Sequence, residues 1–194
     1  IGDLRLEALA NYYTFDSIPI VKRCLYLFAA AERNEYGILP GFVYENPCFY
    51  SGKWFLIDYS LMFICSLCDL YSHAGDDETF RDLYPIAKSI LDVLDSTKDG
   101  DGLVTAESGS AFIDWCPGLF KSSSLEGIYL YTLDRWCETL ESIGENDGAE
   151  LYRARLEQGR ISARKYLYDE KNGTFINERD KYQYSVHPAS WMVL

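Results

Sequence analysis

Apolar residues recur along most of this chain at intervals of three and four, the repeat that places side chains on one face of an α-helix. In the stretch after Ser17, Pro19 lies in the first turn, where proline is tolerated, and one apolar face follows. That face consists of Ile20, Val21, Cys24, Leu25 and Phe28. The pattern predicts an all-α fold with helices over residues 3–13, 17–33, 58–73, 77–94, 119–143 and 147–168, and a seventh that begins near residue 189.

The predicted helix over residues 58–73 is apolar around much of its circumference, so we expect it to be buried on more than one side. Long loops separate the helices at residues 36–56 and 95–118, and a third follows residue 168. Each loop opens with an acidic or amide residue, a glycine and an apolar pair, and the glycines are Gly37, Gly102 and Gly173. Ordinary helix C-terminal chemistry explains each turn singly, but it does not explain their spacing of 65 and 71 residues. The spacing favours a degenerate repeat of consecutive helical hairpins.

The composition narrows the possible partners. The chain has 194 residues and a net charge of −12, and it has no cluster of Lys and Arg that would bind a nucleic-acid backbone. It has no apolar run long enough to span a membrane. Aromatic residues make up 15% of the chain. They fit either a helical core packed with large rings or a carbohydrate site, in which rings stack on sugars and carboxylates bind hydroxyls.

Cysteine and histidine residues do not indicate a cofactor. The six cysteines are spread through apolar stretches, which favours reduced thiols and a cytosolic protein, and Cys65 and Cys68 form a lone CxxC motif. Residues 95–100 resemble half of a calcium loop, but Ala106 stands where the bidentate Glu is needed, so we interpret them as a turn. His73 and His187 are the only imidazoles, and without a GxSxG elbow a Ser/His/Asp hydrolase is not indicated. We expect no metal or organic cofactor.

Carboxylates next to aromatic residues at loop–helix junctions are the candidate functional groups, because glycoside hydrolysis needs paired carboxyl groups and a surface that holds the sugar. The candidates are Asp3, Glu45, Asp58 and Asp114, together with Trp54 and Trp115. A structural alternative exists for three of them. Asp58 fits a helix N-cap, Asp114 fits an Asx-turn before Pro117, and Glu45 fits a solvated loop charge.

The order of three short motifs is similar to that of the six-hairpin (α/α)6 glycosidases, above all the catalytic domain of bacterial α-L-rhamnosidases, glycoside hydrolase family 78. Gly2-Asp3 resembles the end of a Trp-x-Gly-Asp segment, and residues 113–115 resemble a Gly-Asp-Trp segment with Ile113 in place of Gly. Residues 56–59, Leu-Ile-Asp-Tyr, resemble a Trp-Gly-Asp-Ala segment. Asp58 matches the Asp of that segment, and its Trp and Ala are lost. The end of the chain, Ser190-Trp191-Met192, resembles the next helix of the family.

The resemblance implies that residues 1–194 are about half of a single (α/α)6 catalytic domain, truncated at both ends. It implies an inverting α-L-rhamnosidase whose general acid and general base lie outside the chain, with Asp3 beside the acid as an auxiliary carboxylate. It also implies a −1 subsite lined by Asp3, Asp58, Asp114 and Trp115, and Trp54 and Glu45 complete the substrate-binding set that we expect. Two alternatives stay open: another six-hairpin exo-glycosidase, or a non-catalytic helical-repeat module that binds a protein or a glycan.

Overall fold

The computed structural model describes residues 1–44, 50–51 and 54–194, and these residues form two compact units. Unit 1 comprises residues 1–93 and 108–110, and unit 2 comprises residues 94–107 and 111–194. The fold is all-α, as the periodicity predicts, and α5 and α6 form the most extensively packed consecutive pair of the described helices. None of the described helices is both long enough and apolar enough to cross a membrane.

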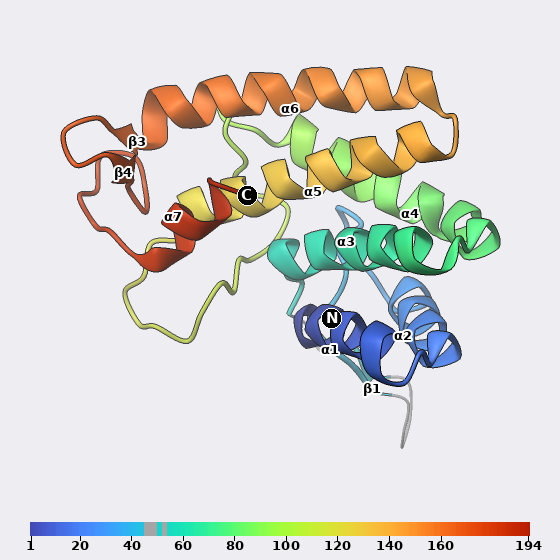
Figure 1. The fold of residues 1–194 in the computed structure, drawn as a ribbon. Coiled ribbons are helices and arrows are strands. Elements are labelled where there is room, and N and C mark those ends of the chain that lie inside the picture. Colours follow the sequence, from blue (N-terminus) through green and yellow to red (C-terminus); the bar gives the residue numbers. More distant parts are fainter. Residues whose placement is uncertain (45–49, 52–53) are drawn as a thin grey trace. The chain divides into compact units, whose positions relative to one another are not determined.

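Unit 1 is built on one buried helix. Its helices are α1 (Gly2–Thr14), α2 (Ile18–Ala29), α3 (Ile57–Ala74) and most of α4 (Asp77–Ser96). Both α1 and α2 pack against α3, as Figure 1 shows. Every residue of α3 from Ile57 to Leu70 except Tyr59 is buried, which confirms the expectation of burial on more than one side. Gly75 then ends α3 in the left-handed conformation that glycine adopts without strain.

A buried ion pair ties α1 to α3. The Arg5 Nε atom donates to Asp69 Oδ2 at 2.8 Å, and both side chains are about nine-tenths buried. One turn further along α3, the ring of His73 stacks on the ring of Tyr12 at 4.3 Å, and His73 Nε2 lies 3.3 Å from Asp16 Oδ1. Polar and ring contacts therefore join α1 to the C-terminal part of α3, in addition to apolar burial.

Unit 2 is a helical hairpin with a short third helix. In Figure 1, α6 (Asn146–Leu167) runs alongside α5 (Ser122–Ser142), and α7 (Val186–Trp191) packs on α5. Large rings fill the space between α5 and α6, where Trp136, Tyr129 and Tyr152 are fully buried. Many of the chain's aromatic residues therefore do belong to a core, although several others lie on the surface.

Two of the three predicted repeat turns share one hydrogen-bond pattern, and the third has a variant of it. Asn34 Oδ1 accepts from the amides two and four residues later, at 3.1 and 2.9 Å, and Asp99 Oδ1 does the same at 2.9 and 3.0 Å. Asp169 Oδ1 accepts from the amides two and three residues later. The glycines that follow have φ angles of 84°, 80° and 65°. Each side-chain oxygen thus closes a turn that only glycine completes without strain, which explains the sequence repeat.

The structure corrects the boundaries and adds two hairpins. The helix expected over residues 17–33 ends at Ala29, because the Asn34 turn requires non-helical backbone, and the helix expected from residue 119 begins at Ser122. Strand β1 (Val43–Tyr44) pairs antiparallel with β2 (Tyr50–Ser51), and β3 (Tyr168–Asp169) pairs antiparallel with β4 (Thr174–Phe175). These strands have two residues each, too few to show an alternating pattern.

Candidate functional site

Two of the predicted carboxylates lie near each other in unit 1, at the starts of two packed helices. Asp3 lies in the first turn of α1 and is exposed, and Asp58 lies in the first turn of α3 and is 3% exposed. Both are near the Tyr59 hydroxyl: burial, and then the charges of Asp3 and Asp58, raise the pKa of Tyr59. We call these three residues the acidic cluster of unit 1.

Gly2 explains how the two helix starts come so close. A Cβ atom at this position would lie 3.0 Å from Tyr59 Cε1 and 3.1 Å from Tyr59 Cζ, so the backbone of α1 passes directly over the tyrosine ring. The Gly2-Asp3 motif therefore has a physical reason in this chain, because a side chain at Gly2 would crowd the Tyr59 ring. Helix N-termini also favour negative charge, which offsets part of the repulsion between the two carboxylates.

The N-cap alternative for Asp58 is wrong. The N-cap of α3 is Leu56, which makes no side-chain capping bond, and Asp58 lies two residues further on. The amide of Ile57 is instead satisfied by the backbone carbonyl of Ser110, at 2.8 Å. The first amide of α3 is thus satisfied by a loop carbonyl, and the N-cap position is held by Leu56 rather than by Asp58.

The other two candidates in this part of the sequence are Trp54 and Glu45. Trp54 is 59% exposed, and its carbonyl accepts from the Gly41 amide at 2.7 Å, so its ring is available at the surface. Glu45 lies outside the described residues, and its predicted role stays a prediction.

In unit 2, Asp114 accepts hydrogen bonds with both of its oxygens. Oδ1 accepts from the Trp115 amide at 2.6 Å, and Oδ2 lies 3.0 Å from His187 Nε2. His187 Nδ1 in turn lies 3.3 Å from the Ser185 hydroxyl. The Asp114 side chain remains 46% exposed, so the carboxylate is held in place while its outer edge faces solvent.

An aromatic pair stands beside this carboxylate. Trp115 is 77% exposed, and its ring meets the ring of Phe112 edge-on at 4.9 Å between centroids. Lys121 steadies the same loop, because its Nζ donates to the Ala111 carbonyl at 3.1 Å and lies over the Phe112 ring. We call Phe112, Asp114, Trp115 and His187 the Asp114 cluster. An exposed indole beside a fixed carboxylate is an arrangement that binds the apolar face and the hydroxyls of a sugar.

The Asp114 loop has a strained turn immediately before the carboxylate. Ile113 has a φ of 55°, and the Asp114 amide donates back to the Phe112 carbonyl at 2.6 Å. A β-branched residue rarely adopts positive φ, whereas glycine does so freely. The Asx-turn expected before Pro117 is therefore not the main feature of this loop, since the tight turn centres on Ile113 and Asp114 Oδ1 accepts from the amide of the next residue.

The structure places the other sequence features in structural roles. Cys65 and Cys68 lie buried in α3, and the calcium-like residues 95–100 are the end of α4 followed by a turn, in which Arg179 pairs with Asp99. Within the described ranges no group of three or more His, Cys, Asp or Glu side chains converges as a metal site.

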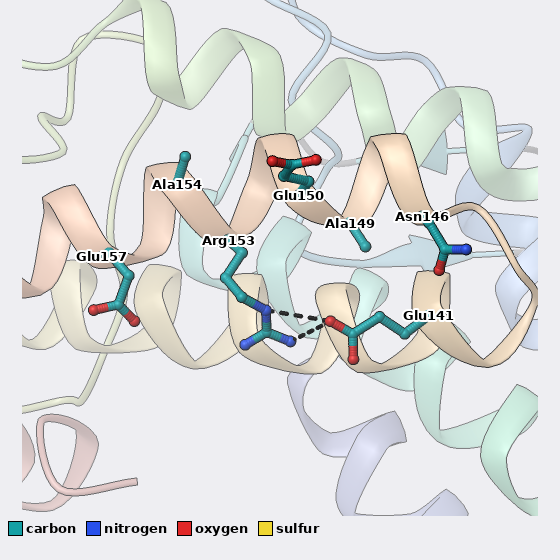
Figure 2. Close-up of a pocket in the computed structure, with 7 residues that line it drawn as sticks. All are labelled: Glu141, Asn146, Ala149, Glu150, Arg153, Ala154 and Glu157. Atoms are coloured by element: carbon teal, nitrogen blue, oxygen red, sulfur yellow. Dashed lines mark hydrogen bonds and ion pairs between the residues drawn. The ribbon is translucent and has the colours of Figure 1, made fainter.

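Unit 2 also has an open surface hollow of about 420 Å³, and none of the predicted site residues is among those that line it. Figure 2 shows Arg153 and Glu141 pointing toward each other across it, with two hydrogen bonds from the guanidinium to Glu141 Oε1 at 2.7 and 3.2 Å. This pair joins α5 to α6, and it engages Arg153, the basic residue among those that line the hollow. The residues that line it are Glu141, Asn146, Ala149, Glu150, Arg153, Ala154 and Glu157.

Comparison with known proteins identifies the family. Residues 1–188 match the family model described as the bacterial α-L-rhamnosidase six-hairpin glycosidase domain, and the chain belongs to this family. A solved structure titled rhamnosidase from Klebsiella oxytoca with rhamnose bound is similar over the whole chain, with 34% sequence identity and a TM-score of 0.90. The chain covers 37% of that protein's length.

A second solved structure shows the same fold at lower identity. The family 78 rhamnosidase of Bacillus sp. GL1 matches 91% of this chain with a TM-score of 0.75 and 20% sequence identity. The chain covers 18% of its length. A search of curated proteins returned no match.

Sequence reasoning missed Tyr59 and His187 as members of these clusters. Tyr59 had a signal, because it directly follows Asp58 and so begins the same helix. His187 had none that could be read along the chain, since 73 residues separate it from Asp114.

Proposed function

We propose that this chain is part of the catalytic domain of an inverting glycosidase that hydrolyses terminal α-L-rhamnosides. The observation that carries the proposal is the family match over residues 1–188, supported by the likeness to a rhamnosidase with rhamnose bound. Because the chain covers 37% of that protein, we propose that residues 1–194 belong to one larger (α/α)6 domain. The acid and the base are then supplied by residues outside this chain.

The two clusters described above are proposed to bind the substrate. In the Asp114 cluster, the carboxylate accepts hydrogen bonds from sugar hydroxyls with the lone pairs that Trp115 and His187 leave unused, and the exposed indole stacks on the apolar face of the ring. Asp58 is proposed to bind a hydroxyl in the same manner. The fixed negative charge of Asp3 is proposed to keep a neighbouring carboxylic acid protonated, so that it can donate to the leaving oxygen.

The experiment that tests the proposal is hydrolysis of a panel of aryl glycosides by the full-length protein and by its Asp114→Asn variant. We expect release from the α-L-rhamnoside, and we expect kcat/KM to fall roughly tenfold or more in the variant, because the amide has lost one acceptor and its charge. Asp147→Asn serves as the matched control, since Asp147 is an exposed carboxylate in the first turn of α6.

Three other outcomes of this experiment would change the proposal. Release from a different sugar would keep the glycosidase class and move the substrate. An unaffected Asp114→Asn variant would remove Asp114 from the binding site. No release from any glycoside, with retained binding of L-rhamnose, would favour a non-catalytic carbohydrate-binding module.

A further inference from the structure

His187 connects the Asp114 loop to the start of a helix far along the chain. Its Nε2 atom lies 3.0 Å from Asp114 Oδ2, and its Nδ1 atom lies 3.3 Å from the Ser185 hydroxyl, at the N-cap of α7. The imidazole is about three-quarters buried, whereas Asp114 is about half exposed. The contact therefore joins an enclosed ring to a carboxylate that still faces solvent.

The chemistry of the three groups fixes the direction of the hydrogen bonds. A carboxylate only accepts, so the proton must be on His187 Nε2, and in the neutral ring Nδ1 then accepts from the Ser185 hydroxyl. The chain of donors runs from Ser185 to His187 to Asp114. A second donor, the Trp115 amide, holds the other oxygen of Asp114 at 2.6 Å. Together the two donors set the plane of the carboxylate.

The loop needs such support because its own backbone does not provide it. Residues 111–118 contain no helix or strand, and Ile113 is held at a φ of 55°, which is strained for a β-branched side chain. The Trp115 amide moves with the loop, so it cannot fix Asp114 relative to the rest of unit 2. His187 can, because α7 packs on α5: a Cβ at Gly127 of α5 would lie 2.7 Å from Trp191 Cβ.

We propose that His187 is a positioning residue for substrate binding, which orients the Asp114 carboxylate by hydrogen bonding and leaves its outer lone pairs aimed at the hydroxyls of a neutral sugar. The inference rests on the proposed function for its ligand, but the hydrogen-bond relay itself is independent of which sugar binds. It also means that α7 takes part in substrate recognition through His187, a residue that lies outside the motif around Asp114.

A double-mutant cycle in the full-length protein tests this inference. The variants are His187→Leu, which keeps bulk and removes the donor, His187→Gln, whose amide donor reaches the same oxygen, Asp114→Asn, and the double variant Asp114→Asn/His187→Leu. The measurements are the Kd of L-rhamnose by calorimetry and KM and kcat on the aryl α-L-rhamnoside. His73→Leu is the matched control, because His73 also pairs with a carboxylate, Asp16, but in unit 1.

We expect His187→Leu to weaken L-rhamnose binding and raise KM roughly tenfold, and His187→Gln to return both to within about threefold of the original protein. In the double variant His187→Leu should add less than about a twofold further loss, since it acts through Asp114. Full additivity of the two losses, or equal impairment by Leu and Gln, would overturn the positioning role, since a purely structural histidine gives those results.

Hydrogen exchange separates this inference from the proposed function. The Trp115 amide should exchange faster in His187→Leu than in His187→Gln, because Asp114 is no longer held in place to accept from it. If the original protein neither binds nor hydrolyses any rhamnoside while this difference is seen, the proposed function fails and the positioning of Asp114 stands. Equal exchange of the Trp115 amide in all His187 variants contradicts the positioning role whatever the activity.

Discussion

At the scale of single residues, a buried carboxyl group in α5 gives unit 2 a pH-dependent stability. Glu126 is fully buried, and burial raises its pKa to about 7 although the Val104 amide donates to its Oε2 at 2.7 Å. Its other oxygen, Oε1, has no hydrogen-bond partner within the part of the chain that the structure describes. Lys98 and Asp99 are the charged groups near it, and their effects on its pKa are opposite. Below about pH 7 the protonated acid is therefore the form that the folded protein favours.

We predict that the original protein becomes less stable as the pH rises and that the Glu126→Gln variant does not show this decrease. Because the folded pKa is raised from 4.5 to about 7, the folded state holds the proton more tightly, and the stabilisation present below pH 4.5 is lost as the pH rises through 7. The full shift in pKa corresponds to a decrease in the free energy of unfolding on the order of 3 kcal/mol between low and high pH. Urea unfolding of both proteins at pH 5 and pH 8 measures it.

The exposed Glu150→Gln is the control for this measurement, since Glu150 lies on the surface of α6. The control should keep the pH dependence of the original protein. If Glu126→Gln keeps it as well, the carboxyl group of Glu126 is not the one that titrates on unfolding.

At the scale of elements, glycines in α5 and α6 set how closely the helices of unit 2 approach. A Cβ at Gly127 would lie 2.7 Å from Trp191 Cβ and 3.1 Å from the Trp191 carbonyl carbon, so α7 must move to admit it. A Cβ at Gly159 would lie 2.5 Å from Leu130 Cδ2, which is the end of a flexible side chain. The two sites therefore look equally crowded, but different groups have to yield.

We predict that Gly127→Ala displaces α7, whereas Gly159→Ala does not. The first substitution should destabilise the protein by about 1–3 kcal/mol, the usual cost of overpacking against backbone. The second should cost less, because alanine also gains helix propensity over glycine and Leu130 can change rotamer. Thermal unfolding measures the difference, and hydrogen exchange in residues 186–191 shows whether α7 has moved. A larger loss for Gly159→Ala would contradict this account of the packing.

The element scale also shows where sequence patterns are sufficient. The long helices α3, α5 and α6 follow directly from their apolar spacing, and two of the three turns follow from an Asn or Asp three residues before a glycine, because both signals are local. The early end of α2, the two-residue hairpins and the uncapped start of α3 do not follow from local signals. In α3 the partner of the Ile57 amide is the Ser110 carbonyl, 53 residues away.

At the scale of the whole molecule, the charge of the chain bears on what it binds. Thirty acidic and eighteen basic side chains repel a polyanion and do not oppose a neutral sugar. We predict that L-rhamnose at about 100 times its Kd stabilises the full-length protein by roughly 2.7 kcal/mol and so raises its Tm. Differential scanning calorimetry measures the shift.

L-Fucose, which differs from L-rhamnose in the configuration of its hydroxyl groups, is the control ligand and should produce a smaller shift. The Asp114→Asn variant should reduce the shift with L-rhamnose, because its ligand hydroxyls lose a charged acceptor. Equal shifts with both sugars would argue against hydroxyl recognition by these clusters.

The sequence by itself determined the helices, the repeat turns and the family resemblance, which the comparisons confirm, and it identified Asp3, Asp58 and Asp114 as candidates. Only the tertiary structure decided that Asp3 and Asp58 lie near Tyr59, that His187 contacts Asp114, and that Ile113 has a positive φ. The reason is physical. Helix periodicity and turn chemistry act over a few residues, whereas the partners of a side chain are set by packing between segments that are distant in the sequence.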